Sequence, residues 1–241
     1  MAKGWGRRAD GFRWRGGEIS RLEGFSDAVF AFAVTLLVVS LEVPRTFTEL
    51  WSVMRGLPAF AVCFTLLIVI WHEHYVFFRR YGLQDTTTVW LNAGLLFVML
   101  FYVYPLKFVF TLFLAPVTGT PTVVPAPRGG AESIIELDQI PKLFVIYGAG
   151  VIALYVFMGL LYVHAYRRRA DLDLTPLEAF DTRASIRACA LSASVGALSI
   201  ALALTLPLRL VGLAGWCYGL LGPVLGFHGG WTGKRRRKLE K

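Results

Sequence analysis

The sequence has 241 residues, 56% of them hydrophobic, and a mean hydropathy of +0.56. An ordinary soluble domain rarely carries so much apolar sequence, and an aromatic content of 14% suits the belts that membrane proteins place at the bilayer surface. The formal net charge is +9, and 19 of the 25 lysines and arginines fall in four segments: 1–21, 79–80, 167–187 and 234–241.

Residues 1–21 form a basic, tryptophan-bearing arm at the start of the chain. The arm has no apolar stretch of the kind that a secretory signal needs, so no cleavable signal peptide is expected. We expect the arm to be mobile or to lie on the membrane surface.

Six segments are apolar over the roughly 20 residues that a membrane-spanning helix needs. They are residues 22–43, 50–72, 88–113, 140–165, 185–206 and 209–228. Pro44 and the Leu-Pro pair at 206–207 end the first and fifth helices, because proline cannot continue the hydrogen-bond ladder. The predicted fold is therefore all-α, a polytopic membrane protein with one six-helix domain over 22–228 and a basic tail over 229–241.

The first predicted helix carries a stripe along one face. At about 100° per residue, the members of the stripe are Ala28, Phe32, Thr35, Val39 and Glu42, with Leu36 beside them. Ser26 and Asp27 point away from this stripe. Ordinary packing or lipid contact is the alternative interpretation of the stripe, because nearly every residue in this segment is apolar.

Polar residues gather at one end of the first three helices. Trp71 and His74 are three residues apart and share a face of the second helix, and Asn92 lies early in the third. With Arg21, Ser26 and Asp27 they are expected to form a buried network in which Asp27 pairs with Arg21 or His74. The alternative is that each side chain is separately solvated at the interface.

The sequence "HEH" at 72–74 gives no metal site, because His72 and His74 point in different directions on a helix and the spacing is not that of a zinc motif. No arrangement of a nucleophile with a base beside it stands out in the sequence. Ser192 and Ser194 lie in an apolar helix without a histidine or a carboxylate, so an enzyme is not expected. Cys63, Cys189 and Cys217 also lie in apolar runs and give no disulfide framework.

The connections between the helices differ in charge. The connection over 115–139 is rich in proline and glycine and is expected to be flexible. The connection before the fifth helix contains "LTPLEAF", a helix start with Thr175 as N-cap, Pro176 first and Glu178 third. Because basic residues gather on alternate connections, the positive-inside rule places both termini in the cytoplasm.

The first helix resembles a known family at Arg21, Phe25, Ser26 and Asp27, an R-x-x-x-F-S-D signature followed by the apolar run "AVFAFAVTLLV". Trp71, His74 and the "LN" at 91–92 also match. The segment is similar to the prokaryotic transmembrane protein 175-type potassium channels, relatives of the animal lysosomal potassium channel. The resemblance implies a potassium-preferring channel without a re-entrant pore loop, in the plasma membrane of a bacterium.

In that family four six-helix subunits surround an axial pore that the first helix lines. The resemblance therefore implies a homotetramer whose partners are further copies of the chain, membrane lipids and potassium ions, with no cofactor and no nucleic acid. It implies constriction rings at Phe32, Leu36 and Val39, and a pore hydroxyl at Thr35. Phe32 departs from the family, which usually has Ile or Leu there, and four phenylalanine rings at one level would narrow the axis.

Two further roles follow from the position of charges. Glu42 at the outer mouth would concentrate cations, although simple solvation at the interface explains it equally well. Asp27, which points away from the stripe, is interpreted as a clasp between helices, together with Arg21, His74 or Asn92.

Two other functions remain open from the sequence. A secondary transporter would need broken helices and ionisable residues at the midplane, which the central parts of these helices lack. A non-conducting scaffold would bind anionic lipid through the basic cluster at 234–238, although this cluster also serves to fix the topology.

Overall fold

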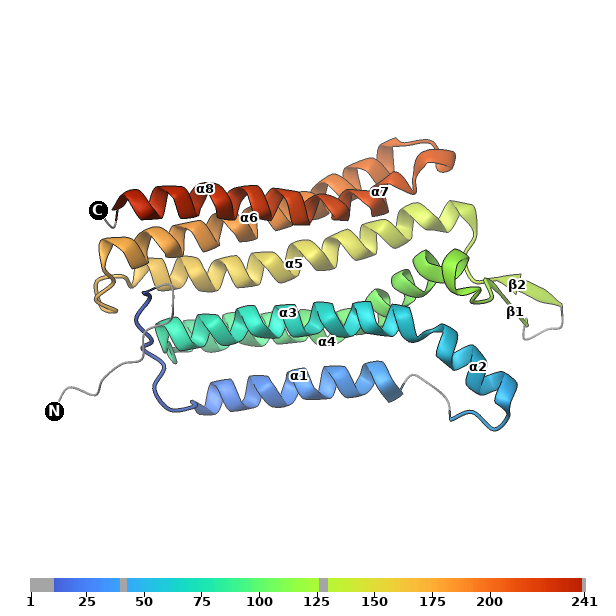
Figure 1. The fold of residues 1–241 in the computed structure, drawn as a ribbon, viewed down its shortest axis with the longest axis horizontal. Helices are drawn as coiled ribbons and strands as arrows, with labels where there is room; N and C mark the ends of the chain where they lie inside the picture. The colour runs from blue at the N-terminus through green and yellow to red at the C-terminus, as the bar shows by residue number, and fades with distance from the viewer. Residues whose placement is uncertain (1–10, 40–42, 126–129, 240–241) are drawn as a thin grey trace.

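The computed structural model describes residues 11–39, 43–125 and 130–239. Over these ranges the chain is a long bundle of helices (Figure 1). Six helical segments are long and apolar enough to cross a membrane, which confirms the predicted number. Their bounds are Arg21–Val39, Leu57–Tyr81, Thr86–Thr118, Leu137–Arg167, Pro176–Thr205 and Leu208–Leu239.

The elements follow one another along the chain as α1 (Arg21–Val39), α2 (Phe47–Arg55), α3 (Leu57–Tyr81), α4 (Thr86–Thr118), β1 (Val123–Pro125), β2 (Ala131–Ser133), η1 (Leu137–Gln139), α5 (Ile140–Arg167), α6 (Pro176–Thr205), η2 (Leu208–Leu210), α7 (Leu213–Trp216), η3 (Cys217–Leu220) and α8 (Leu221–Leu239).

The second predicted helix is displaced in the structure. Residues 47–55 form the separate helix α2, and α3 begins at Leu57 with Pro58 in its first turn. Proline favours such a position because its missing N–H needs no partner there. At the other end α3 continues nine residues past His72, to Tyr81, because His74, Phe77 and Phe78 are buried inside the protein.

The last two predicted helices also change. Helix α6 begins at Pro176, where the predicted capping box of Thr175 and Glu178 is present. Its first two turns are polar, which is why hydropathy alone placed the start nine residues later. Residues 208–220 form three short helical turns, η2, α7 and η3, and the continuous helix α8 covers 221–239.

The connection over 115–139 is more ordered than predicted. Helix α4 extends to Thr118, and β1 pairs with β2 in antiparallel register, with Val123 opposite Ser133.

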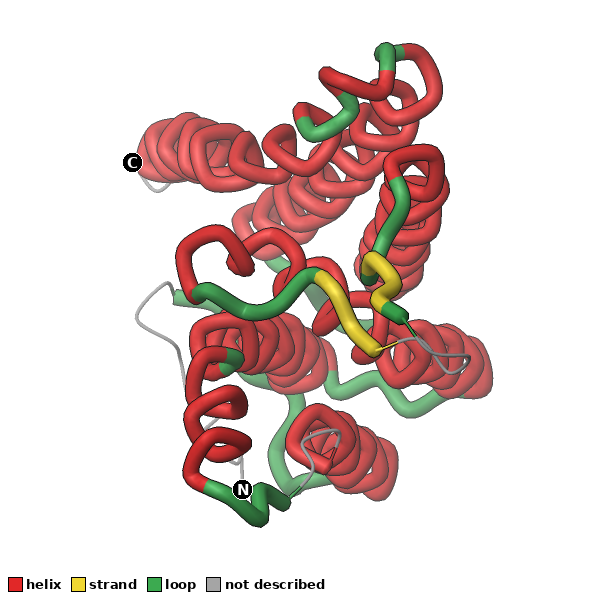
Figure 2. Tube along the Cα trace, turned by 90° about the vertical axis from the view of Figure 1, so that its right-hand side faces the viewer, coloured by secondary structure: helices red, strands yellow, loops and turns green. Residues whose placement is uncertain are grey.

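Neighbouring helices pack in a simple order. Helix α1 contacts α3 and α4, α4 contacts α5, α5 packs along α6, and α6 contacts α8. Seen end on, α1, α3 and α4 form one group and α5, α6 and α8 another (Figure 2). The loops 82–85 and 168–175, the start of α1 and the end of α8 share one end of the bundle, here called the loop end. Helix α2 and the β1–β2 pair lie at the opposite end.

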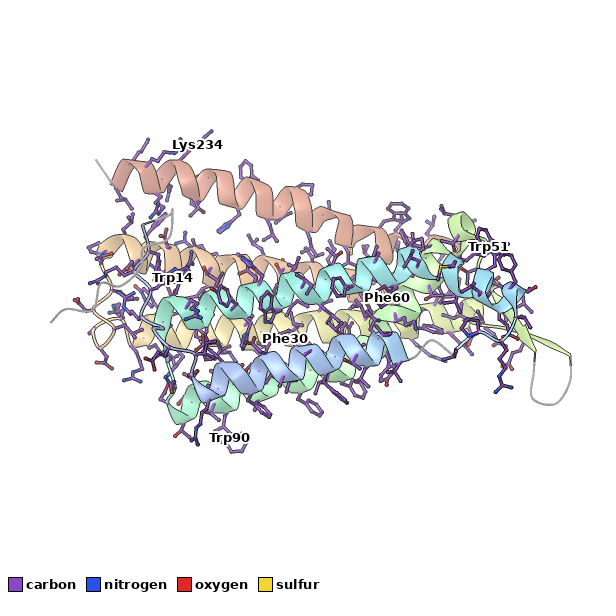
Figure 3. All side chains as sticks on the ribbon, turned by 60° about the horizontal axis from the view of Figure 1, so that its bottom comes forward. Trp14, Phe30, Trp51, Phe60, Trp90 and Lys234 are labelled. Carbon is purple, nitrogen blue, oxygen red and sulfur yellow. The ribbon has the colours of Figure 1, made fainter. Side chains whose placement is uncertain are left out.

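Two tryptophans mark these ends. Trp90 points outward near the loop end and Trp51 at the opposite end (Figure 3), with exposed fractions of 73% and 55%. Tryptophan is enriched at both surfaces of a bilayer, so the two side chains suit a bundle that crosses a membrane lengthwise.

The described part of the N-terminal arm, residues 11–20, forms a strap across the loop end. Phe12 is fully buried and meets the ring of Tyr81 edge to face at 5.7 Å. The backbone N–H groups of Arg15 and Gly16 donate to the Arg79 carbonyl at 3.1 Å. The expectation of a mobile or membrane-lying arm is therefore wrong for residues 11–20.

The strap is also held by charge. Arg15 Nη2 lies 2.7 Å from Glu178 Oε2, and the backbone N–H of Arg13 donates to Glu178 Oε1 at 2.8 Å. The hydrogen bond to Glu178 raises the pKa of Arg13. Gly82, with φ +59°, lies so close beneath the strap that a Cβ there would be 3.0 Å from the Arg15 carbonyl. The loop end is thus closed by a segment that joins α1 to α3 and α6.

Candidate functional site

Helix α1 has one buried face. Its buried residues are Glu23, Ser26, Phe30, Ala33 and Leu37, which recur every three or four positions. Phe30, Ala33 and Leu37 belong to one apolar cluster with residues of α3, α4 and α5. This spacing is that of a helix packed along one side, so the rest of the chain fixes the rotation of α1 about its axis.

The other face of α1 is exposed in the part of the chain that the structure describes. Phe25, Phe32 and Val39 have exposed fractions of 61%, 56% and 69%, and Thr35 is also exposed. Leu36 is half-buried beside them. The stripe expected from the sequence is therefore on the outside of the single subunit. Glu42, its last member, lies outside the described residues.

Thr35 uses only part of its hydrogen-bonding capacity. Its hydroxyl donates to the Ala31 carbonyl one turn earlier, at 2.9 Å. A hydroxyl has one donor and two acceptor lone pairs, so the oxygen still has lone pairs with which it can face an ion.

A buried polar network joins α1, α3 and α4 near the loop end. Asn92 Nδ2 donates to Ser26 Oγ at 2.9 Å, and Asn92 Oδ1 lies 2.7 Å from His74 Nε2. Because an amide oxygen only accepts, Nε2 of His74 carries the proton in this bond. The hydroxyl of Ser26 donates a hydrogen bond to the Leu22 carbonyl at 2.8 Å. All three side chains are at most 1% exposed.

Asp27 is part of a second contact beside this network. The indole N–H of Trp71 donates to Asp27 Oδ1 at 2.8 Å. Within the described residues no ion pair joins Asp27 to Arg21, and no hydrogen bond joins it to His74. The expected partners of Asp27 were therefore wrong. Hydrogen bonds bring together Ser26, Asn92 and His74 in one group and Asp27 and Trp71 in another, while Arg21 and Phe25 are exposed.

The "HEH" segment divides as its helical spacing predicts. His74 is buried in the network, whereas His72 and Glu73 are exposed on α3.

These features can be compared with known proteins. The family model described as "Endosomal/lysosomal potassium channel TMEM175" matches residues 21–102, which contain α1, α3 and the polar network. A potassium channel of Marivirga tractuosa is 43% identical over 95% of this chain and 93% of its own length. The chain belongs to the TMEM175 family.

Solved structures of the TMEM175 family agree with this assignment. The crystal structure of a variant of the potassium channel MtTMEM175, in complex with a nanobody–MBP fusion protein, superposes with a TM-score of 0.79 at 40% identity. It covers 95% of this chain and all of the matched one. A lysosomal potassium-selective channel TMEM175 homolog from Chamaesiphon minutus shares the fold, with a TM-score of 0.54 at 20% identity. It covers 88% of this chain and 96% of the matched one.

An ionic contact that sequence reasoning missed joins the region matched by the TMEM175 model to the end of α5. Asp85, directly before α4, lies 2.8 Å from His164 Nε2 and 3.9 Å from Arg168 Nη1, both at the end of α5. Thr88 donates to the same carboxylate at 2.5 Å. Burial raises the pKa of Asp85, but the bonds from Thr88 and His164 outweigh it and leave the pKa lowered.

For each of the two missed contacts, Asp85 with His164 and Arg15 with Glu178, the sequence indicates only one of the two partners. Asp85 precedes the run Thr86–Thr88, and Thr175 precedes Glu178 by three residues, which are helix-start signals. Neither signal indicates which distant residue contacts the carboxylate. His164 lies 79 residues from Asp85, and Arg15 lies 163 residues from Glu178.

Proposed function

We propose that this chain is a potassium-preferring cation channel that works as a homotetramer, with α1 lining an axial pore. The single observation that carries the proposal is the exposed apolar stripe with Thr35 in it, on a helix whose opposite face is anchored. The potassium channel of Marivirga tractuosa, 43% identical over nearly the whole chain, supports the choice of ion.

The proposed pore has two kinds of lining. Rings of Phe32, Leu36 and Val39 from four subunits form the constrictions and gate by dewetting, as apolar constrictions do. Four Thr35 oxygens replace part of the hydration shell of a passing ion, because the hydroxyl proton is held by the Ala31 carbonyl. Glu42 concentrates cations at the outer mouth. Phe32 forms the narrowest ring.

The polar network sets the orientation of α1, the proposed pore helix. Ser26, Asn92 and His74 fix the rotation of α1 against α3 and α4, and Asp27 with Trp71 adds a second contact. The network therefore acts on the pore through the position of α1, while the apolar face touches the ions.

We also propose that the channel lies in a bacterial plasma membrane with the loop end in the cytoplasm. The basic residues at 13–21, 79–80, 167–169 and 234–238 all belong to segments at this end. Cytoplasmic segments carry the excess of lysine and arginine in membrane proteins. The channel domain covers 22–228, and the basic residues after it continue α8. We assign the channel no enzymatic activity and no cofactor.

Flux from liposomes tests the channel directly. The purified full-length chain is reconstituted with a potassium gradient, and potassium and sodium fluxes are measured over a range of voltage and pH. We expect potassium flux to exceed sodium flux. Saturating uptake coupled to a second ion would indicate a transporter instead, and the absence of flux under all conditions would leave a scaffold.

Matched substitutions test the lining. Thr35→Val is expected to change the potassium-to-sodium ratio, whereas Thr65→Val is not. Thr65 is also exposed and donates to its own preceding turn at 2.8 Å, but it lies on α3. Phe32→Leu is expected to raise flux, and Phe97→Leu on the exposed side of α4 is not. Equal effects of the two threonines would contradict a pore along α1.

Subunit number is tested separately by the mass of the complex in detergent. A cysteine at Val39, at the exposed end of α1, is expected to cross-link neighbouring subunits, since four such side chains would meet at the axis. A monomer that conducts would contradict the tetramer while leaving the channel activity in place.

A further inference from the structure

The half of the bundle away from the loop end contains a deep apolar groove. It has a volume of about 820 Å³ and lies between α3 and α4 on one side and α5 and the turns 208–221 on the other. Ligand sites of proteins fall in the range of about 300–1,000 Å³ and are lined mostly by apolar and aromatic side chains with few polar groups. The groove therefore has the size and the lining of a binding site.

The groove carries one charge. Among its lining residues only Arg209 is charged, and it is an exposed residue of η2 at the end of the groove. In the part of the chain that the structure describes, no ion pair involves Arg209, whereas Lys142 on the same end lies 3.9 Å from Asp138. An amphiphile with an apolar body and an anionic head complements such a lining.

The depth of the groove points to the bilayer as the source of this amphiphile. Its walls are membrane-spanning helices. Trp216 lies at the same end as Arg209, is 66% exposed, and meets the ring of Phe113 at 5.2 Å. Tryptophan and arginine at the end of a span sit at headgroup level. Arg209 is thus at the depth of a lipid phosphate.

We propose that this groove binds one phospholipid of the surrounding membrane, with its acyl chains along α4 and α5 and its phosphate at Arg209. The guanidinium suits this role because it binds phosphate oxygens in a bidentate manner. The proposal is independent of ion conduction, since it concerns only the lining of the groove.

The bound lipid lies close to the packing of α1. Met99, Tyr102 and Val103 line the groove and also belong to the apolar cluster that holds Phe30 and Leu37. Because a ligand that binds only the folded state stabilises it, occupancy of the groove raises the unfolding temperature of the chain.

A photoreactive phosphatidylglycerol, with a diazirine at the end of one acyl chain, tests the site in vesicles that hold the full-length protein. Adducts are mapped by mass spectrometry of peptides. We expect adducts on the groove-lining segments 102–113 and 143–155. Arg209→Gln is expected to lower them about fivefold, as the loss of one headgroup contact implies. Arg45→Gln, an exposed arginine outside the groove, is the matched control and leaves them unchanged.

A second pair of variants tests whether the acyl chains occupy the apolar part of the groove. Gly219 lines the groove and Gly222 does not, and a Cβ at either position meets nothing within 4 Å. Gly219→Leu is therefore expected to fold and to reduce the adducts, whereas Gly222→Leu is expected to retain them. Purified protein supplied with phosphatidylglycerol unfolds at a higher temperature than protein without it, and Arg209→Gln removes most of this difference.

Three outcomes overturn the proposal. Phe97 and Phe101 face outward on α4, away from the groove. If they are labelled as strongly as the groove, the label reports ordinary surrounding lipid. Equal labelling by a neutral diacylglycerol with the same photoreactive chain would exclude the phosphate contact. Cross-links between subunits through cysteines placed at Leu143, without lipid adducts, would show that a second copy of the chain fills the groove.

Discussion

Helix α1 presents two faces with opposite relations to the rest of the chain. The face with Ser26, Phe30 and Leu37 is buried and joined to α3 and α4 by hydrogen bonds and apolar contacts. The face with Phe32 and Thr35 is exposed in the part of the chain that the structure describes. The difference separates the residues that set the position of the helix from those that we propose to meet the ion. Changes on the first face should act on stability, and changes on the second on transport.

The largest expected effect comes from the apolar core of the buried face. Leu37→Ala should lower the free energy of unfolding by about 2–5 kcal/mol, since it leaves a cavity where a fully buried side chain stood. Leu36→Ala, the neighbouring half-buried leucine, is the matched control and should cost much less. Unfolding of the purified protein in detergent measures both. Equal losses would mean that the two faces are not distinguished by packing.

The polar network should give the next largest effect. Asn92→Ala leaves Ser26 and His74 without their partner, and each buried polar group left unpaired costs about 1–3 kcal/mol. Gln84→Ala removes an exposed amide and should change little. The same unfolding measurement applies. Wild-type stability of the Asn92 variant would show that the network does not anchor α1.

A smaller effect is expected at Asp27. Asp27→Ala removes the acceptor of the Trp71 indole, a hydrogen bond worth about 0.5–1.5 kcal/mol, and should reduce the yield of assembled protein. Asp27→Asn retains an oxygen at this position and should retain most of the yield. The assembled fraction is then tested for ion selectivity, which should equal that of the wild type. A changed selectivity in well-assembled protein would place Asp27 on the conducting face.

The smallest effect concerns the contact between α4 and α5, away from α1. Asp85 has a lowered pKa in the folded chain, so its ionised form stabilises the fold above the usual carboxyl range, and this contribution is lost as the pH falls through that range. Asp85→Asn should cost about 0.2–1 kcal/mol at neutral pH, as partly exposed ion pairs do.

The loss in the Asp85 variant should shrink toward zero when unfolding is measured at progressively lower pH. Asp171→Asn is the control, because Asp171 pairs with Arg168 only three residues away and on the exposed surface. If the loss of stability in the Asp85 variant grew on acidification, this would contradict a lowered pKa of Asp85 in the folded chain.

Much of the fold follows from the sequence because the bilayer imposes a simple rule on length and hydropathy. All six spans were predicted, and the cap at Thr175 was found from its residues alone. The predicted helix bounds are wrong where hydropathy alone does not set the end of a helix. Helix α3 continues through polar "HEH" because His74 finds a partner inside the protein. Hydropathy did not show that the last span begins as short helical turns over 208–220.

The candidate site was predicted in part. Helical spacing identified the stripe of Phe32, Thr35 and Val39 and set it apart from Asp27. It did not give the partner of Asp27, because Trp71 and His74 share a face of α3 and only the packing angle decides which of them reaches the carboxylate. The strap was missed for a related reason, since Phe12 and Arg15 find their partners in helices that follow much later in the chain.

The strap has a consequence for how the protein is made. The bonds from Arg13 and Arg15 to Glu178 span 165 and 163 residues, so they cannot form until the start of α6 has been synthesised. Helix α1 is therefore fixed at its loop end only after helices that follow it in the chain have been made. A nascent chain can hold α1 beside α3 and α4 early through the polar network, but the strap can close over the loop end only after the first turn of α6 has been made.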